Sequence, residues 1–487
     1  MFFGRVQTGP CPSAPGAASA GEEPSTPPIL PVHRSGRLIR CTGSRSLATI
    51  QWVSTGYALA LSMAIPLTGW AVERFGPKTL WILSLGLFIS GSILCGAAWS
   101  VGSLIAFRIL QGFGGGMLMP VGQTMLARAA GPERMGRMMA VIAVPAMLAP
   151  VLGPVLGGVI VDHLSWRWMF YVNVPFCALA LVMAVRLLPR DTDRRPGRRL
   201  DVLGLALLSP GLAALVYGLS EAGNGSAPTS ARVLLGLGAG VVLLAAFGVH
   251  ALRRGREALV DLSLFRSRAF AASTAALFCY AAGVIGLTVL LPLYFQLVRH
   301  ESPLHAGLLI APWGLGAMLT MPVSGRITDR IGPRGVGLAG VLVVLLGMLP
   351  FTRIAVTTST ATLVGAVFAV GLGHGLVMPS LMAAMYQGLD KASVPAATTA
   401  GNILVRVGGA FGTALLAVVL QIYIRADLPG TGRDLASVAT VRTPAAPALL
   451  TGDFAGAFWW AVAVGAVALV PLLLLPRRRS AGADPAG

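Results

Sequence analysis

Long apolar stretches recur along the whole chain and are separated by short polar connections. A bilayer core about 30 Å thick needs roughly 20 mostly apolar residues of helix. Only a helix satisfies its own backbone hydrogen bonds within lipid in a single segment. The pattern therefore predicts thirteen membrane-spanning helices. The thirteen apolar runs cover residues 50–72, 79–98, 101–126, 138–161, 167–188, 202–220, 232–252, 270–297, 304–327, 335–355, 359–384, 397–424 and 454–475.

The composition supports a chain that lies in lipid. Of its 487 residues, 55% are hydrophobic and only 11% are charged, and the mean hydropathy is +0.76. A single water-soluble core cannot bury so much apolar surface. The net charge of +19 comes mostly from arginines in short clusters between the runs, which argues against a nucleic-acid-binding protein. We predict an all-α, multi-pass membrane protein.

The basic residues also predict an orientation. Connections after alternate runs, together with the carboxyl tail, hold 23 Lys and Arg residues, whereas the opposite set holds 7. Basic connections tend to stay in the cytoplasm. We therefore expect a cell-membrane protein whose C-terminus is cytoplasmic.

One pattern occurs twice, as PLTGWAVERFGPK at 66–78 and PVSGRITDRIGPR at 322–334. The offset is a constant 256 residues, and GGGMLMP at 114–120 matches GHGLVMP at 373–379 at an offset of 259. The chain is thus predicted to contain two related halves. The paired positions are Gly69 and Gly325, Glu73 and Asp329, Arg74 and Arg330, and Gly76 and Gly332.

The repeat also predicts the domain organisation. The runs at 202–220 and 232–252 have no counterpart, so they are an inserted pair. The run at 270–297 should have a partner near 14–41, where no helix could span a membrane. We therefore expect a missing first helix, caused by a misassigned start or a frameshift. The expected parts are a disordered, basic, Pro-rich tail (1–46), an N-terminal half (47–188), loops with the inserted pair (189–269), a six-helix C-terminal half (270–476) and a cytoplasmic tail (477–487).

The repeated pattern suggests a gate at the cytoplasmic surface. Gly69 and Gly325 permit close helix approach, and the Gly-Pro pairs form tight turns. Glu73 or Asp329 could pair with an arginine, or face the start of a neighbouring helix, in one arrangement of the halves only. The alternative is ordinary charge at helix ends.

The repeated pattern resembles the loop signature G-x-L-A-D-R-x-G-R-K of the major facilitator superfamily. LIAFRILQGFGGG at 104–116 resembles the fourth-helix motif of that family, and APVLGPVLGG at 149–158 resembles its antiporter motif. With WRWMFYVNVPF at 166–176, the chain resembles the fourteen-helix drug:proton antiporters of the EmrB/QacA type. The antiporter-motif residues are Gly153, Pro154, Gly157 and Gly158.

The resemblance implies a major facilitator fold of two six-helix halves plus two inserted helices. It also implies proton-driven efflux of small hydrophobic or cationic drugs by a monomer that needs no metal or cofactor. A truncated, non-pumping remnant and an exporter of an endogenous metabolite remain alternatives. The stretch GPKT at 76–79 lacks the Gly-Lys-Ser/Thr of a phosphate loop, which argues against an ATP-driven transporter. The scattered histidines argue against a membrane enzyme.

The corresponding fold nominates six side chains for the proton and substrate cavity. Placing an arginine inside an apolar run costs free energy in lipid, so its presence there indicates a functional role. Aromatic faces can bind cations. The sequence places no Asp or Glu in the middle of a run, so His374 is the titratable candidate. The alternatives are a snorkelling anchor for the arginine, a hydrogen-bonded packing residue for the histidine, and packing or lipid contact for the aromatic residues. The six candidates are Arg108, Gln111, Tyr57, Tyr280, Trp313 and His374.

Overall fold

A computed structural model describes residues 45–130, 164–191, 199–223, 229–355, 357–427 and 446–476, with isolated positions 138, 153, 160 and 197. Of the expected tails (1–46 and 477–487), residues 1–44 and 477–487 lie outside these residues, and the helix α1 begins at Arg45. Residues 51–487 form one compact unit, and the packing described below is within it.

The described residues are almost entirely helical and contain no strand. Their main helices are α1 (Arg45–Phe75), α2 (Pro77–Gly96), α3 (Val101–Ala130), α6 (Trp168–Tyr171), α7 (Asn173–Leu187), α8 (Val202–Gly223), α9 (Ala231–Arg254), α10 (Arg268–Leu297), α11 (Pro303–Ile331), α12 (Pro333–Thr352), α13 (Thr360–Met385), α14 (Val394–Asp427), α16 (Ala446–Val467) and α17 (Leu469–Leu474). Two short 3₁₀ turns, η2 (Gly255–Glu257) and η3 (Leu262–Arg266), connect α9 to α10.

Twelve of these segments are long and apolar enough to cross a membrane. They coincide with twelve of the thirteen apolar runs, with α6 and α7 forming one span and α16 and α17 another. The prediction of an all-α, multi-pass membrane protein is therefore confirmed. The remaining run, 138–161, lies outside the described ranges.

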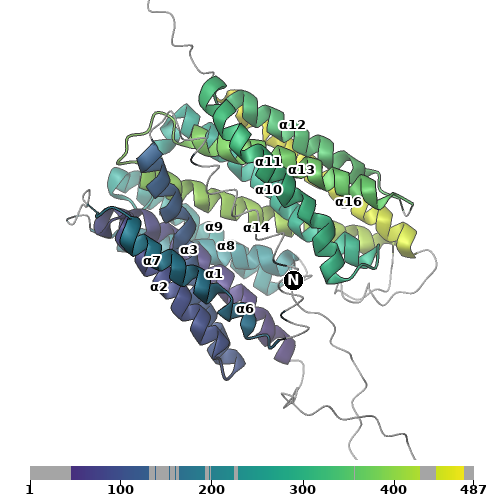
Figure 1. The fold of residues 1–487 in the computed structure, drawn as a ribbon, viewed down its shortest axis with the longest axis horizontal. Helices are drawn as coiled ribbons and strands as arrows, with labels where there is room; N and C mark the ends of the chain where they lie inside the picture. The colour runs from purple at the N-terminus through teal and green to yellow at the C-terminus, as the bar shows by residue number, and fades with distance from the viewer. Residues whose placement is uncertain are drawn as a thin grey trace, which may run out of the picture. The chain divides into compact units, whose positions relative to one another are not determined.

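The two halves have separate apolar cores. α1, α2 and α3 pack around a small core that includes Ala64, Val72, Leu80 and Val121. The larger core joins α10, α12, α13, α14 and α16, and it also takes in Leu208 of α8. In Figure 1, α1, α2, α3 and α7 group together, and α10 to α13 with α16 form a second group. The inserted helix α8 thus shares the core of the C-terminal half.

Both copies of the repeated pattern fold into the same turn, which we call the GP turn (75–78 and 331–334). Gly76 has φ 91° and ψ 153°, and Gly332 has φ 92° and ψ 161°. Only glycine adopts this region without strain. Each turn ends one helix and starts the next with proline, because proline lacks the N–H that a first helical residue would leave unpaired.

The two GP turns lie on the same face of the helical unit. α10 and α14 run parallel, because Gly408 packs on Phe278 and Gly412 on Ala282. Near the start of α14, Thr399 contacts Gly69 at the end of α1. α11 returns toward the start of α10, so its GP turn reaches the same face as that of α1. We call this the GP face.

The repeat is also visible in the packing of helices. A side chain at Gly112 or Gly116 would clash with the main-chain oxygen of Tyr57 or Leu61. The matching glycines of the other half, Gly371 and Gly375, meet Trp313 and Ala317 in the same way. α1 therefore lies along α3 as α11 lies along α13, which close glycine contacts allow.

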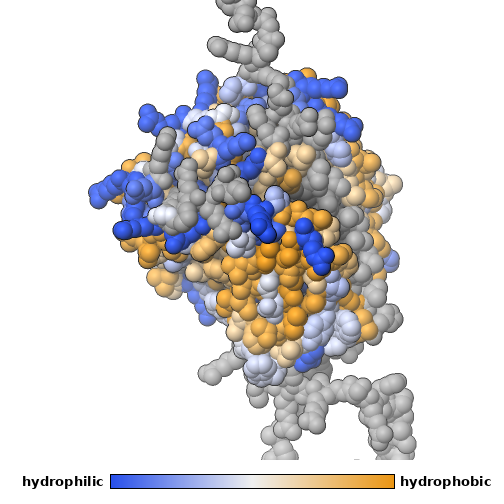
Figure 2. All heavy atoms as spheres, turned by 60° about the vertical axis from the view of Figure 1, so that its left-hand side comes forward, coloured by the Kyte–Doolittle hydropathy of each residue, from blue (hydrophilic) through white to orange (hydrophobic). Residues whose placement is uncertain are grey.

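Apolar side chains cover much of the outer surface of the helices. Figure 2 shows them as a broad orange area, with hydrophilic side chains gathered toward one end. Exposed examples are Leu235, Leu252, Leu319 and Leu346. Such a surface is stable in lipid and would aggregate in water.

Candidate functional site

Arg108 lies at the centre of a polar cluster in the N-terminal half. Its Nη1 donates to Gln111 Oε1 at 2.9 Å, and its Nε donates to the carbonyl oxygen of Val53 at 3.3 Å. The guanidinium carbon stands 4.3 Å from the ring centroid of Tyr57. Gln111 is buried and donates to Ser92 Oγ at 2.6 Å. The structure thus brings together three of the six predicted cavity residues, on α1 and α3.

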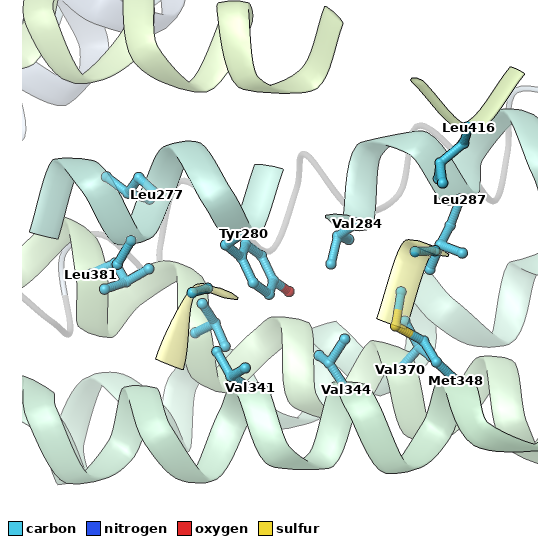
Figure 3. Close-up of a cluster of buried hydrophobic side chains, with 14 of the residues drawn as sticks. Leu277, Tyr280, Val284, Leu287, Val341, Val344, Met348, Val370, Leu381 and Leu416 are labelled. Carbon is cyan, nitrogen blue, oxygen red and sulfur yellow. The ribbon is translucent and has the colours of Figure 1, made fainter. Parts of the chain in front are cut away.

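The other three predicted residues meet in the C-terminal half. Tyr280 Oη and His374 Nδ1 are 3.0 Å apart, and the ring centroids of Trp313 and His374 are 5.9 Å apart. Figure 3 shows Tyr280 among aliphatic side chains, including Leu277, Val341 and Val344. The His374 imidazole is only half-buried. Apolar side chains therefore surround this hydrogen-bonded pair on one side only.

The two clusters stand at related positions of the repeat. Tyr57 corresponds to Trp313, and each supplies the carbonyl that contacts a glycine of α3 or α13. His374 corresponds to Gly115, where an added side chain would approach the hydroxyl of Tyr57. The aromatic rings of the two halves are therefore equivalent, whereas the basic side chains of Arg108 and His374 stand at different positions of the repeat.

The first GP turn is held by a residue that the sequence did not suggest. Asp191, beyond the end of α7, accepts hydrogen bonds from the Lys78 and Thr79 amides, both at 2.9 Å, and from Thr79 Oγ1 at 2.8 Å. A side chain on Gly76 would collide with this carboxylate. Asp191 thus binds the positive start of α2, where a carboxylate is favourable.

The charged residues of the two GP turns differ in burial. Glu73 is buried, Arg74 is half-buried, Asp329 is half-buried and Arg330 is exposed. The sequence pairs Glu73 with Asp329, yet only the first is enclosed. Their role as a latch stays a prediction.

The halves touch near the GP face through α14. Thr399 of α14 packs against Gly69, where an added side chain would approach Thr399 Oγ1 to 2.9 Å. Asn402 Nδ2 donates to Gln123 Oε1 of α3 at 2.7 Å. These two contacts join helices from different halves.

The antiporter motif lies largely outside the described residues. Gly153 is described as helical and half-buried, whereas Pro154, Gly157 and Gly158 are not described. The bend that the sequence predicts for this helix therefore stays a prediction.

Two ionisable residues within the helices escaped the sequence reasoning. α16 begins at Ala446, earlier than the predicted start at 454, so Asp453 lies inside a helix and is 2% exposed. It lies near the start of the membrane-length segment Leu449–Leu474, so the expectation of no acidic residue in the middle of a run holds for this residue. Asp453 interrupts the apolar run, which is why hydropathy alone began the run after it. Arg406, the second residue, lies well inside α14 and is exposed.

The sequence profile of the Major Facilitator Superfamily matches residues 42–413. The chain belongs to this superfamily. The Multidrug resistance protein B homolog of Mycobacterium tuberculosis is 41% identical over 377 residues, which are 77% of this chain and 69% of that protein. The Lincomycin resistance protein LmrB of Bacillus subtilis is 29% identical over 431 residues, 88% of each chain.

A solved structure supports the same fold for this superfamily member. The proton:xylose symporter XylE superimposes with a TM-score of 0.60 over 90% of this chain and 88% of its own, at 13% sequence identity. The major facilitator fold predicted from the repeated motifs is therefore confirmed. The chain is a transporter of this superfamily rather than an enzyme.

Proposed function

We propose that this transporter exports small hydrophobic drugs from the cytoplasm in exchange for protons. The observation that carries the proposal is the 41% identity to the Multidrug resistance protein B homolog over 377 residues. The lower similarity to the Lincomycin resistance protein LmrB supports the same class of substrate. On the orientation predicted from the basic residues, the GP face is the cytoplasmic face.

The proposed mechanism is a rocking of the two halves about a site between them. The Thr399–Gly69 packing and the Asn402–Gln123 hydrogen bond close the GP face. Substrate would enter from the cytoplasm when both contacts open, and it would leave on the opposite side when they re-form. The Arg108–Tyr57 and His374–Trp313 pairs lie on the helices that would face the substrate.

Proton coupling requires a group that exchanges its proton during this cycle. Two candidates among the described side chains are His374 and Asp453. His374 shares a hydrogen bond with Tyr280, and movement of α10 against α13 would break it. The Asp453 carboxyl is buried beside the Asp427 carboxyl, and two adjacent carboxyl groups favour a shared proton.

The test is efflux from proteoliposomes that hold purified protein and a fluorescent hydrophobic dye. We expect dye movement when the acceptor side is made acidic, and its loss when an ionophore removes the proton gradient. Movement that continues without the gradient would exclude proton coupling. His374→Asn and Asp453→Asn separate the two candidate carriers, because only the true carrier should lose the dependence on the gradient.

Arg108 provides a second test of the site. Arg108→Ala should abolish driven efflux while the protein stays folded in the membrane, because Gln111 and Tyr57 lose their shared partner. Arg108→Lys keeps the charge but not the forked set of donors, so we expect partial activity. Efflux of Arg108→Ala at the wild-type rate would remove this residue from the proposed site.

A further inference from the structure

Arg406 is a cation far inside a membrane helix. α14 begins at Val394, so Arg406 lies more than three turns from the start, at 3.6 residues a turn. Its side chain is exposed. Within the described ranges it forms neither a hydrogen bond nor an ion pair. A guanidinium in this state is free to bind an anion that reaches it.

The helical register shows which way Arg406 faces. Asn402, one turn earlier, bonds to Gln123 of α3, and Thr399, two turns earlier, packs on Gly69 of α1. Residues four and seven apart share one face of a helix. Gly408 lies on the opposite face and packs on Phe278 of α10. Arg406 therefore faces the N-terminal half, and Tyr57 is the ionisable group near it.

We call this face of α14 the seam, defined by Thr399, Asn402 and Arg406. At the first two positions α14 touches the N-terminal half, whereas at Arg406 the side chain is exposed. The gap between the two halves along the seam thus widens as the distance from the GP face increases. Arg406 is the cation at the point where the halves separate, and Tyr57, which lies near it, also contacts Arg108.

The described parts of the helices beside the seam contain no acidic residue away from their ends. Glu73 lies at the end of α1, Glu221 at the end of α8 and Asp427 at the end of α14. Asp453 belongs to α16, which packs on the far side of the C-terminal half against α10, α12, α14 and α17. Two arginines without a nearby carboxylate make the seam positive, which repels cations and attracts anions.

We propose that Arg406 binds an anionic group, such as a carboxylate, on a hydrophobic substrate that lies in the seam. This inference rests on the proposed export function and narrows its substrate class from hydrophobic or cationic drugs to hydrophobic anions. The apolar body would lie against the aromatic residues Tyr57 and Trp313. The guanidinium would supply the charge-assisted hydrogen bonds that orient it.

The test uses three probes that share one apolar body, namely 4-biphenylcarboxylate, its methyl ester and 4-biphenylmethylammonium. Their binding to the purified, full-length protein in phosphatidylcholine nanodiscs is measured by calorimetry without a proton gradient. We expect the wild type to prefer the carboxylate. Arg406→Gln should lose this preference, with carboxylate affinity falling on the order of tenfold, and should bind the ester as the wild type does.

Two variants serve as controls. Arg406→Lys keeps a cation and should retain part of the preference, and Arg253→Gln removes an exposed arginine on α9 and should change nothing. Unchanged ester binding shows that Arg406→Gln is folded. A wild type that binds the ammonium probe as tightly as the carboxylate, or an Arg406→Gln variant that keeps the preference, overturns the proposal.

A lipid phosphate is the other source of an anion at this position. Repeating the titrations with phosphatidylglycerol in the nanodiscs distinguishes the two. Competition by this lipid that disappears in Arg406→Gln would assign the site to a headgroup and overturn a substrate role. Because binding is measured without a gradient, failure of proton-driven efflux and failure of anion binding are separate results.

Discussion

Lys78 and Arg334 occupy the same position in the two GP turns and make equivalent contacts. Lys78 Nζ donates to the Leu188 carbonyl at 2.6 Å, and Arg334 Nη1 donates to the Leu475 carbonyl at 3.3 Å. Leu188 follows the last turn of α7 and Leu475 that of α17. In each half, a cation from the GP turn thus binds the negative end of the last helix described in that half.

Removal of either cation should lower the stability of the half that contains it. Lys78→Gln should lower the free energy of unfolding by about 1 kcal/mol, because the charge-assisted hydrogen bond is lost. Lys78→Arg is the matched control and should retain most of the stability. Thermal unfolding in detergent measures both, and equal melting temperatures for Lys78→Gln and the wild type would contradict the prediction.

Replacing either GP-turn glycine by alanine should lower the free energy of unfolding. Gly76→Ala and Gly332→Ala place a side chain where φ is near +90°, which costs about 1 to 3 kcal/mol each. Gly76→Ala should be worse, because its side chain would also collide with Asp191. Gly335→Ala, where nothing lies close, is the control. Unfolding curves that rank the two GP-turn variants in the reverse order would count against the Asp191 contact.

The Asn402–Gln123 hydrogen bond should couple the two halves. Both side chains belong to apolar helices, where such bonds average about 0.6 kcal/mol in double-mutant cycles. We expect Asn402→Leu and Gln123→Leu to show a coupling of this size in unfolding experiments. The single variants should also increase labelling of a cysteine placed on the GP face. Additive effects with unchanged labelling would show that the contact does not hold the face closed.

Asp201 should make stability depend on pH. Burial raises its pKa, but hydrogen bonds from the Gly204 and Leu259 amides and from His250 outweigh that effect and leave the pKa below its usual 3.8. Because the folded pKa is the lower one, its contribution is present above pH 3.8 and is lost as pH falls through the folded pKa.

Asp201→Asn tests this linkage. Near neutral pH it should lower the free energy of unfolding by about 1 to 3 kcal/mol, since buried donors lose a charged acceptor. The melting curves of variant and wild type should converge in acid. A constant difference at every pH would assign the effect to packing instead. Asp261→Asn, in the connection between α9 and α10, is a control outside this hydrogen-bond network.

The helices were predictable from sequence because a bilayer demands long apolar segments with a satisfied backbone. The nomination of Tyr280, Trp313 and His374 followed from the resemblance to a family fold that brings their helices to one cavity, whereas their direct contacts were not predicted. The contacts of Asp191 with Lys78 and of Asn402 with Gln123 were not predictable. Their partners are 113 and 279 residues apart, and no local pattern marks such polar pairs.

The position of Asp453 shows a different limit. A hydropathy window stops at a carboxylate, although a helix can continue through it when the side chain is buried against other helices. The run at 397–424 places Arg406 near the start of a helix. α14 starts three residues earlier, at Val394, and its register turns Arg406 toward the N-terminal half, which a hydropathy window does not show.

The inserted helix α8 is attached to both halves. Ser209 Oγ donates to the Met63 carbonyl of α1 at 2.9 Å, and Gln421 Nε2 of α14 donates to the Gly223 carbonyl at 3.2 Å. Trp52 of α1 also stacks on Tyr217. Along this edge α8 stands between the acyl chains and the junction of α1 with α14. A compound dissolved in the bilayer would therefore have to displace α8 to enter sideways along this edge.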